Sequence, residues 1–306
     1  METEFVRAED MQDQGRIYLI QNGRRHWIPS PEVAQSYGWD LTKVKILPFE
    51  EICKIRRSYN IAYNFEHSSL PSVCKSNIVF HRVWGRQWFG SQFEGHGLEI
   101  SAASSPWPCK PGVKVDYTDP YREDEGCKTG YENKDYVPLD YQAGLEDMSK
   151  IEKKDYDFIC CSHVIEHTPN VLLAIKNIYE HLSDGGMFVM AVPHMNYTFD
   201  CLRSLTDLHH IVKDYEDFSR ERNILHIVDY FEKVRNGHFG EKEDITKHCY
   251  EYLAGNKNID IHYHTFTEEN MAQIMMWFQE NIYKWNTVEI FNRLEGANEF
   301  FVRLVK

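Results

Sequence analysis

From about residue 78 onward, the chain alternates short apolar runs with segments of helical periodicity. Four of the runs are apolar at both odd and even positions, which suits strands covered on both faces of a parallel sheet. These runs are residues 97–100, 113–117, 156–161 and 187–192. Between the last two, apolar residues recur with helical spacing from Val171 to Leu182, and Ser183 to Gly186 end the segment. The pattern predicts a strand–helix–strand unit and therefore an α/β sheet.

The chain ends in two further apolar segments, residues 287–291 and 300–305, on either side of a turn near Gly296. Such a pair predicts a hairpin, which makes one edge of the sheet antiparallel. We therefore predict an α/β, Rossmann-like, doubly wound and mostly parallel sheet of seven strands with an antiparallel last strand.

The N-terminal part has a different pattern, with apolar segments on either side of Asn22-Gly23. This dipeptide is a strong hairpin signal because both residues tolerate a positive φ angle. Ser30 and Pro31 then supply a cap and a first residue for a short helix. The expected organisation is a small β-rich module at 1–58, a linker and helical cover at 59–96, and the α/β domain at 97–306 with an insert at about 196–263.

Composition and charge narrow the class of protein. Of the 306 residues, 42% are hydrophobic and 14% aromatic, which excludes a fully disordered chain. Asp and Glu number 47 against 34 Lys and Arg, and the resulting formal charge of -13 repels a phosphate backbone. Nucleic acid is therefore not an expected partner.

The cysteines and the N-terminus indicate the compartment. Eight cysteines occur without a C-x-x-C pair, which favours a reducing environment over a disulfide scaffold. Residues 1–13 lack the apolar core of a signal peptide, and no stretch approaches the ~20 apolar residues needed to cross a bilayer. We expect a cytoplasmic protein without a membrane span.

Candidate ligand-binding residues follow the predicted strand ends. In doubly wound sheets, ligands bind beyond the carboxyl ends of the strands, where the strand order reverses. Glu99 lies at the end of the first strand, and Asp119 follows the second strand 20 residues later. A carboxylate at Asp119 can accept hydrogen bonds from two hydroxyls of a ribose. The fourth strand runs directly into His163-Val164-Ile165-Glu166-His167.

Residues 97–306 resemble the class I S-adenosylmethionine-dependent methyltransferases, especially the branch that acts on sugars and small molecules. Glu99 matches the acid of the family's first motif, and Asp119 matches its post-first-strand acid. The family's "fDf…EH" run and "L-x-x-GG" turn match Tyr156-Asp157-Phe158, Glu166-His167 and Leu182-Ser183-Asp184-Gly185-Gly186. The resemblance implies S-adenosylmethionine as cofactor, and it implies that Ser162 and His163 lie in the cofactor site.

A longer run past the fifth strand resembles a subgroup often found beside polysaccharide glycosyltransferases. The run reads Val192-Pro193-His194 and then Phe199-Asp200-x-x-Arg203-x-x-Thr206-x-x-x-His210-x-x-x-Asp214. This resemblance implies an O-methyltransferase that acts on a hydroxyl of a sugar or glycan precursor, with a glycosyltransferase as a candidate partner. The candidate substrate-binding residues are Asp200, Arg203, Thr206 and His264.

The cofactor motifs depart from the family in two places. Three small residues stand where the family has glycines: Ser101, Ala103 and Ser105. Each adds a Cβ where the cofactor would pass the backbone, although their small size favours a pocket that stays open. Gly144 stands where the family often has an acid for the adenine amine, and Glu146 or Asp147 could substitute for it.

Histidines that follow the fourth and fifth strands are the candidate bases for methyl transfer. The sulfonium methyl is already activated, so the protein has to align an acceptor oxygen and remove a weakly acidic hydroxyl proton. His167 is the first choice for this base and His194 the second. His210 and Asp214, four residues apart, would share a helix face on which the carboxylate orients the imidazole.

No metal site is expected. Residues 163–167 match an inverted zinc-protease motif, but that motif needs a helix, whereas His163 directly follows a strand and Pro169 comes soon after. A metal could also be held by three further histidines, His248, His262 and His264. Alternate histidines on a strand point the same way, however, and are common in substrate walls.

Two other classes of function stay open. A degenerate binding or scaffold protein in polysaccharide biosynthesis could keep this sheet after losing the cofactor, and binding of S-adenosylmethionine would separate the two. A hydrolase that uses the histidines with a metal is the third class, and stoichiometric zinc in the purified protein would favour it.

Overall fold

The computed structural model describes residues 4–9, 12–64, 85–120, 135–217, 219–255 and 259–306. The chain divides into two compact units, one of Met1–Ala143 and Tyr156–Cys160, the other of Gly144–Asp155 and Cys161–Lys306. Within the described ranges, no helix is both long enough and apolar enough to cross a membrane. The predicted boundaries at 58 and 96 stay predictions.

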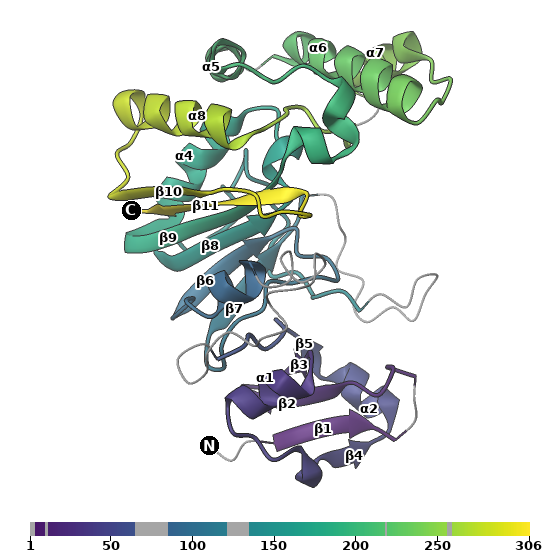
Figure 1. The fold of residues 1–306 in the computed structure, drawn as a ribbon, viewed down its shortest axis with the longest axis vertical. Helices are drawn as coiled ribbons and strands as arrows, with labels where there is room; N and C mark the ends of the chain where they lie inside the picture. The colour runs from purple at the N-terminus through teal and green to yellow at the C-terminus, as the bar shows by residue number, and fades with distance from the viewer. Residues whose placement is uncertain (1–3, 10–11, 65–84, 121–134, 218, 256–258) are drawn as a thin grey trace. The chain divides into compact units, whose positions relative to one another are not determined.

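A five-stranded sheet forms most of the N-terminal module (Figure 1), in the order β4-β1-β2-β3-β5. Its strands are β1 Glu4–Ala8, β2 Ile17–Gln21, β3 Arg24–Ile28, β4 Lys45–Leu47 and β5 Arg56–Arg57. The predicted hairpin is confirmed, since β2 and β3 pair antiparallel around Asn22 and Gly23, whose φ angles are 53° and 71°. The accompanying helices are α1 Pro31–Ser36, η1 Leu41–Lys43 and α2 Phe49–Lys54.

Arginines of the module pair with a later segment of the same unit. Arg25 is buried and donates two hydrogen bonds to the carboxylate of Asp135, at 2.5 and 2.8 Å. Arg56 pairs with Asp140 at 2.7 Å. These contacts supply the external support that a module of this size needs for a stable core.

A second sheet has six strands among the described residues, in the order β10-β11-β9-β8-β6-β7, rather than the seven expected. The strands are β6 His96–Ile100, β7 Lys114–Thr118, β8 Tyr156–Ser162, β9 Leu182–Pro193, β10 Thr287–Phe291 and β11 Glu299–Val305. β6 and β7 pair in parallel, whereas β11 pairs antiparallel with both β9 and β10. The predicted Rossmann-like class and its antiparallel edge are confirmed.

Burial explains the crossover from β8 to β9. Residues 158–161 of β8 are all buried, as expected for a strand covered on both faces. Helix α4, Val171–His181, follows and is capped by Asn170, whose side chain accepts a hydrogen bond from the backbone of Leu173 at 3.0 Å. β9 begins earlier than expected because the glycine turn pairs with the chain end, through Gly185 N and Lys306 O at 2.8 Å.

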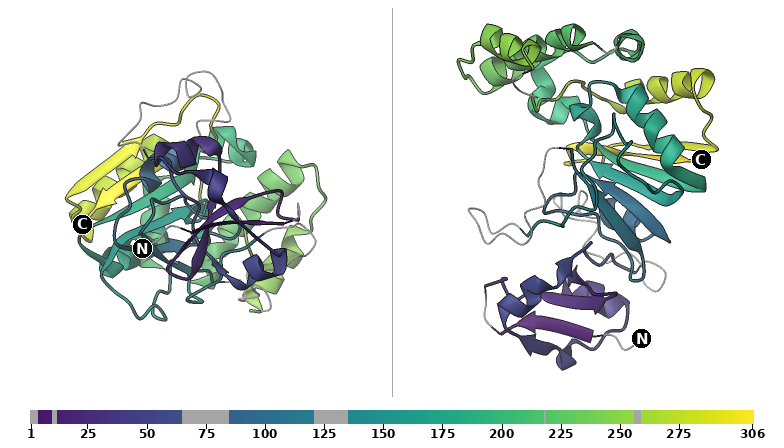
Figure 2. Two further views of the ribbon diagram at one scale, coloured as in Figure 1. Left: turned by 90° about the horizontal axis from the view of Figure 1, so that it is seen from below. Right: turned by 180° about the vertical axis from the view of Figure 1, so that it is seen from behind.

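The predicted insert is helical and has its own core. It contains η4 Met195–Tyr197, η5 Phe199–Leu202, α5 Leu208–Glu216, α6 Arg220–Tyr230, the π-helix η6 Phe231–His238 and α7 Ile245–Leu253, and α8 Glu268–Asn281 follows it. Ile227, Phe231, Tyr252 and Ile261 are buried against one another. Figures 1 and 2 show α5 to α7 as a group apart from α4 and α8, which lie along the strands of the second unit.

Candidate active site

The turn after β6 keeps a glycine-like backbone without glycines. Ser101 and Ala103 have φ angles of 54° and 49°, in the left-handed region that few side chains adopt. Ser101 N donates to Thr118 O at 2.8 Å, and Ala103 O accepts from Val137 N at 3.0 Å. Both side chains are partly exposed, so their added carbons do not fill the interior of the turn. The backbone therefore fits a cofactor-bearing turn.

Glu99 braces this turn from beneath. Its Oε1 accepts a hydrogen bond from the backbone N–H of Trp107 at 2.9 Å, while its Oε2 is buried without a hydrogen-bond partner in the described structure. Burial raises the pKa of Glu99 to about 8, so the carboxyl is largely protonated at neutral pH. A neutral, inward-facing acid fixes the loop.

Asp119 lies where the predicted ribose contact requires. In the parallel register of β6 and β7, Ile100 is opposite Thr118. Ser101 and Asp119 therefore each follow the last paired residue of neighbouring strands. Asp119 is partly exposed. Its ribose contact stays a prediction.

The candidate adenine-binding acids differ in their surroundings. Glu146 Oε1 accepts from the backbone N–H of Asn170 at 2.7 Å, and burial raises the pKa of Glu146 to about 7. Asp147 is exposed and accepts from the backbone N–H of Ser149 at 3.0 Å. Glu146 thus supports the start of α4, whereas Asp147 faces solvent.

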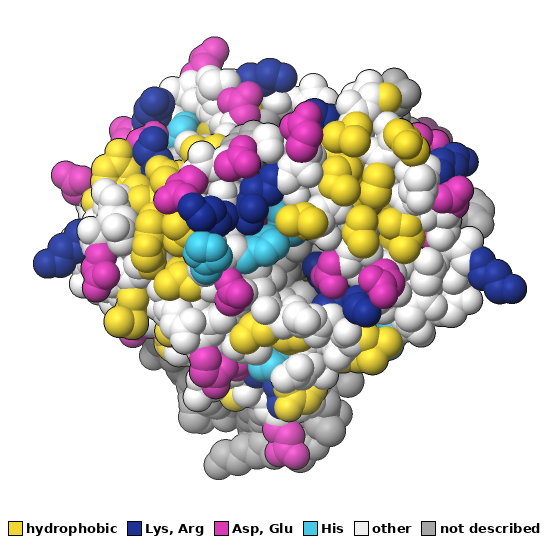
Figure 3. All heavy atoms as spheres, turned by 90° about the horizontal axis from the view of Figure 1, so that it is seen from above, with side chains coloured by type: hydrophobic (Ala, Val, Ile, Leu, Met, Phe, Trp, Pro, Cys, Tyr) yellow, Lys and Arg dark blue, Asp and Glu magenta, His cyan; other side chains and the backbone are white. Residues whose placement is uncertain are grey.

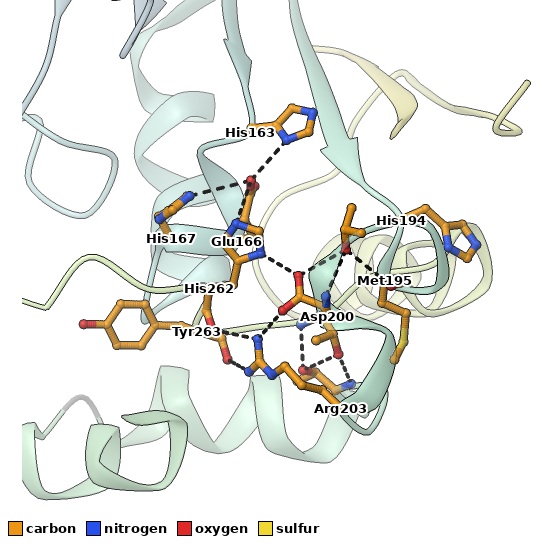
Figure 4. A network of polar contacts seen from close by, with 12 residues as sticks. His163, Glu166, His167, His194, Met195, Asp200, Arg203, His262 and Tyr263 are labelled. Carbon is orange, nitrogen blue, oxygen red and sulfur yellow. Dashed lines mark hydrogen bonds and ion pairs between the residues drawn. The ribbon is translucent and has the colours of Figure 1, made fainter. Parts of the chain in front are cut away.

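The end of β8 turns sharply at His163, whose φ angle is 54°. The Oγ of Ser162, the residue before it, is buried without a hydrogen-bond partner in the described ranges. Residues 165–167 then form the short 3-10 helix η3 rather than an α-helix, which agrees with the rejection of the zinc-protease motif. This turn directs the side chains of His163, Glu166 and His167 into one polar network (Figure 4).

Glu166 lies at the centre of that network and is fully buried. Its Oε1 lies 3.8 Å from His163 Nδ1, 3.9 Å from His167 Nε2 and 3.8 Å from His262 Nε2. Neither carboxylate oxygen has a hydrogen-bond partner in the described part of the chain. The negative charge of Glu166 therefore faces three imidazoles at close range.

A second carboxylate binds the far nitrogen of each of these histidines. The pairs are His163 Nε2 with Glu299 Oε2 at 2.7 Å, His167 Nδ1 with Asp260 Oδ1 at 2.6 Å and His262 Nδ1 with Asp200 Oδ2 at 2.6 Å. Such pairs fix the tautomer and orientation of an imidazole. The arrangement suits either proton transfer or ligation, and Glu166, His167 and His262 have ligand atoms close enough together for one metal ion.

His167 is the most accessible member of the network. Its side chain is 31% exposed, against 8% for His262. Burial alone would lower the pKa of His167, but the hydrogen bond to Asp260 and the nearby charge of Glu166 raise it above its usual value. A reachable imidazole with raised basicity is suited to accept a proton.

Asp200 and Arg203, predicted to bind substrate, lie inside the protein instead of lining an open surface. Arg203 donates to Asp200 at 2.9 Å, to Asp229 at 2.7 Å and to the carbonyl oxygens of His262 and Tyr263 at 2.8 and 3.1 Å. Both side chains are almost fully buried. They hold the segment that carries His262, and direct substrate contact stays a prediction.

The other predicted site residues fall in neighbouring positions. His194 follows β9 and pairs with Glu268 at 3.2 Å. Thr206 and Thr265 share a hydrogen bond between their hydroxyls at 3.2 Å. His210 and Asp214 share one face of α5, as predicted, with Nε2 and Oδ2 3.2 Å apart.

The three histidines considered for a metal do not come together. His262 belongs to the network around Glu166, whereas His264 Nε2 faces Asp214 at 3.7 Å. His248 pairs with Glu243 at 2.9 Å. The expectation that His262 and His264 act from one strand face was wrong, because residues 262–264 are not in a strand and take part in two different clusters.

Sequence reasoning missed Glu299, Asp260 and His226. Glu299 is opposite Pro193 in the pairing of β11 with β9, so a carboxylate at the start of the last apolar run was its only local signal. Asp260 and His226 come from the insert, where no motif indicates which side chains face the sheet.

Comparison with known families gives one match that covers most of the chain. A family described as "Methyltransferase domain" matches residues 80–277. No curated protein matches in sequence. Three similar solved structures follow. An S-adenosylmethionine-dependent methyltransferase of Thermotoga maritima, described as a possible histamine N-methyltransferase, is 12% identical, covers 73% of this chain and 86% of its own, and has a TM-score of 0.38. A cyclopropane-fatty-acyl-phospholipid synthase-like protein of Lactobacillus casei is 12% identical over 75% and 90%, with a TM-score of 0.40. Human N-acetylserotonin methyltransferase in complex with S-adenosylmethionine is 9% identical over 69% and 47%, with a TM-score of 0.35.

Proposed function

This chain belongs to the methyltransferase domain family, as predicted, and we propose that it methylates a hydroxyl of a sugar or glycan precursor with His167 as the general base. The observation that carries this proposal is the accessible His167, held between Asp260 and Glu166.

The residues of this chain fit an S-adenosylmethionine site. The turn at Ser101 and Ala103 has the backbone conformation of the family's glycine motif, and Asp119 follows the neighbouring strand. Ser101, Ala103 and Asp119 would hold the cofactor, with Glu99 as the brace, and the donor-side acids would be Glu146 or Asp147. When bound, S-adenosylmethionine supplies an activated methyl group.

The base works through the two nitrogens of His167. With Nδ1 protonated and bound to Asp260 at 2.6 Å, the lone pair of Nε2 can accept the proton of an acceptor hydroxyl. The imidazolium that forms is stabilised by Asp260 and by Glu166, whose Oε1 lies 3.9 Å from Nε2. Proton removal makes the acceptor oxygen a stronger nucleophile for the methyl group.

The acceptor class rests on the resemblance of residues 199–214 to enzymes found beside polysaccharide glycosyltransferases, and a glycosyltransferase is the partner that we propose on the same ground. Several network carboxylates face histidines instead of solvent, so the hydroxyls of a sugar would be recognised by groups at the rim, such as Thr206. A cytoplasmic location also remains our proposal.

Calorimetry with S-adenosylmethionine and S-adenosylhomocysteine tests the enzyme reading first. Absence of heat and of a thermal shift at millimolar ligand would refute it and favour the scaffold class. If the cofactor binds, His167→Ala should reduce methyl transfer to a panel of sugar acceptors by about 100-fold or more and leave cofactor affinity unchanged. His209→Ala, a change at an exposed histidine of α5, is the matched control. Full turnover by His167→Ala would move the base elsewhere.

A further inference from the structure

A second cluster of histidines lies in the helical insert, apart from the proposed base. His210 and Asp214 lie on α5, His226 lies on α6, and His264 precedes α8. The ligand atoms of these four side chains all lie within 4.8 Å of one another. We propose that His210, Asp214, His226 and His264 form a zinc site.

The distances suit four ligands of one ion. Asp214 Oδ2 lies 3.2 Å from His210 Nε2, 3.3 Å from His226 Nε2 and 3.7 Å from His264 Nε2. His210 Nε2 and His226 Nε2 are 2.8 Å apart. Tetrahedral zinc with bonds of about 2.1 Å places its ligands about 3.4 Å from one another, within the observed range.

The donor set also matches zinc. Three imidazole nitrogens and one carboxylate oxygen are the borderline ligands that zinc takes in proteins, whereas magnesium and calcium prefer oxygen alone. The four side chains carry at most one negative charge, so a divalent ion leaves the site with a small positive charge. The carboxylate is anchored, because Asp214 Oδ1 accepts from Arg222.

Burial points to a ligand inside the cluster. The side chains of Asp214, His226 and His264 are at most 3% exposed, and Asp214 Oδ2 has no hydrogen-bond partner in the described ranges. A buried carboxylate oxygen that faces three imidazoles is expensive unless a cation or a proton neutralises it. The one competing contact is the carbonyl oxygen of Pro169, 3.1 Å from His264 Nε2.

His210 gives the ion a route from solvent. Its side chain is 30% exposed, and Figure 3 shows histidine side chains at the surface between acidic and basic ones on the face seen from above. Because the ligands come from α5, α6 and the segment before α8, a bound ion would tie the insert to the rest of the second unit. The site is therefore structural, and it does not depend on the proposed methyl transfer.

Zinc content and thermal stability of the untagged full chain test this proposal. After dialysis against micromolar zinc, wild type should retain about one zinc per chain and melt about 5 °C or more above the chelator-treated protein. Cobalt(II) in place of zinc should give the intense visible absorption of a four-coordinate site. His210→Ala, which changes the most exposed ligand, should weaken zinc binding at least 10-fold and abolish the thermal shift.

Two control variants make the result specific. His209→Ala, at the adjacent exposed histidine, should bind zinc as wild type does, and so should His167→Ala. Circular dichroism checks that His210→Ala is folded, and His226→Gln repeats the test at a buried ligand. The proposal is overturned if folded wild type retains no zinc, if His210→Ala binds it normally, or if only His167→Ala loses it, since the ion would then belong to the network around Glu166.

Discussion

Replacement of Glu99 by glutamine should make the protein more stable at alkaline pH. An ordinary glutamate has a pKa of 4.5, and burial raises the pKa of Glu99 to about 8 in the folded chain. Between these values the folded protein holds a proton that the unfolded chain has released, so stability falls as pH rises from 4.5 to 8. Integrated from pH 5 to pH 8 at 1.36 kcal/mol per unit, the loss is about 3 kcal/mol.

Glu99→Gln removes this ionisation and keeps an oxygen that can accept from the Trp107 N–H. The variant should match wild type at pH 5 and exceed it by about 3 kcal/mol at pH 8, as measured by urea denaturation followed by tryptophan fluorescence at both pH values. Glu152→Gln, at an exposed carboxylate, is the control and should leave the pH dependence unchanged. A difference between Glu99→Gln and wild type that stays constant from pH 5 to pH 8 would refute the reasoning.

Three further changes test the turn, the brace and the base. Ser101→Gly should relieve a left-handed backbone by about 1 kcal/mol and preserve S-adenosylmethionine affinity in calorimetry; a large loss of affinity would show that the hydroxymethyl group is needed. Arg203→Met should lower the free energy of unfolding by about 3 to 5 kcal/mol, because Asp200 would be left buried without its cation, and an unchanged denaturation midpoint would contradict this. Asp260→Asn should lower the pKa of His167, since it removes the hydrogen bond that raises it, and an NMR titration of the ring that shows no downward shift would exclude Asp260 as the cause.

Much of the fold could be predicted because burial on both faces of a sheet is written in the local hydrophobic pattern. The run at 156–161 became β8, Tyr156–Ser162, and the helical spacing from Val171 became α4. Turn chemistry was equally local, as Asn22 shows by its positive φ. The strand count was less predictable, because pairing between distant segments has no sequence period.

The candidate site could be predicted only where its geometry is local. A spacing of four residues on one helix places His210 beside Asp214, and the structure confirms this. The arrival of His226 from α6 depends on how helices of the insert pack, which no short motif encodes. Ser101 shows the opposite case, since its side chain argued against a glycine-like turn while the surrounding hydrogen bonds impose that turn.

Tyr263 separates His262 from His264 by a single residue, and its backbone N–H donates to the carbonyl oxygen of Glu166 at 2.7 Å. Three residues span at most about 10 Å, too little slack for either histidine to move alone. An engineer who wishes to change the acceptor range should therefore randomise both histidine clusters together in one library, because selection at either cluster alone would be filtered by the geometry of the other.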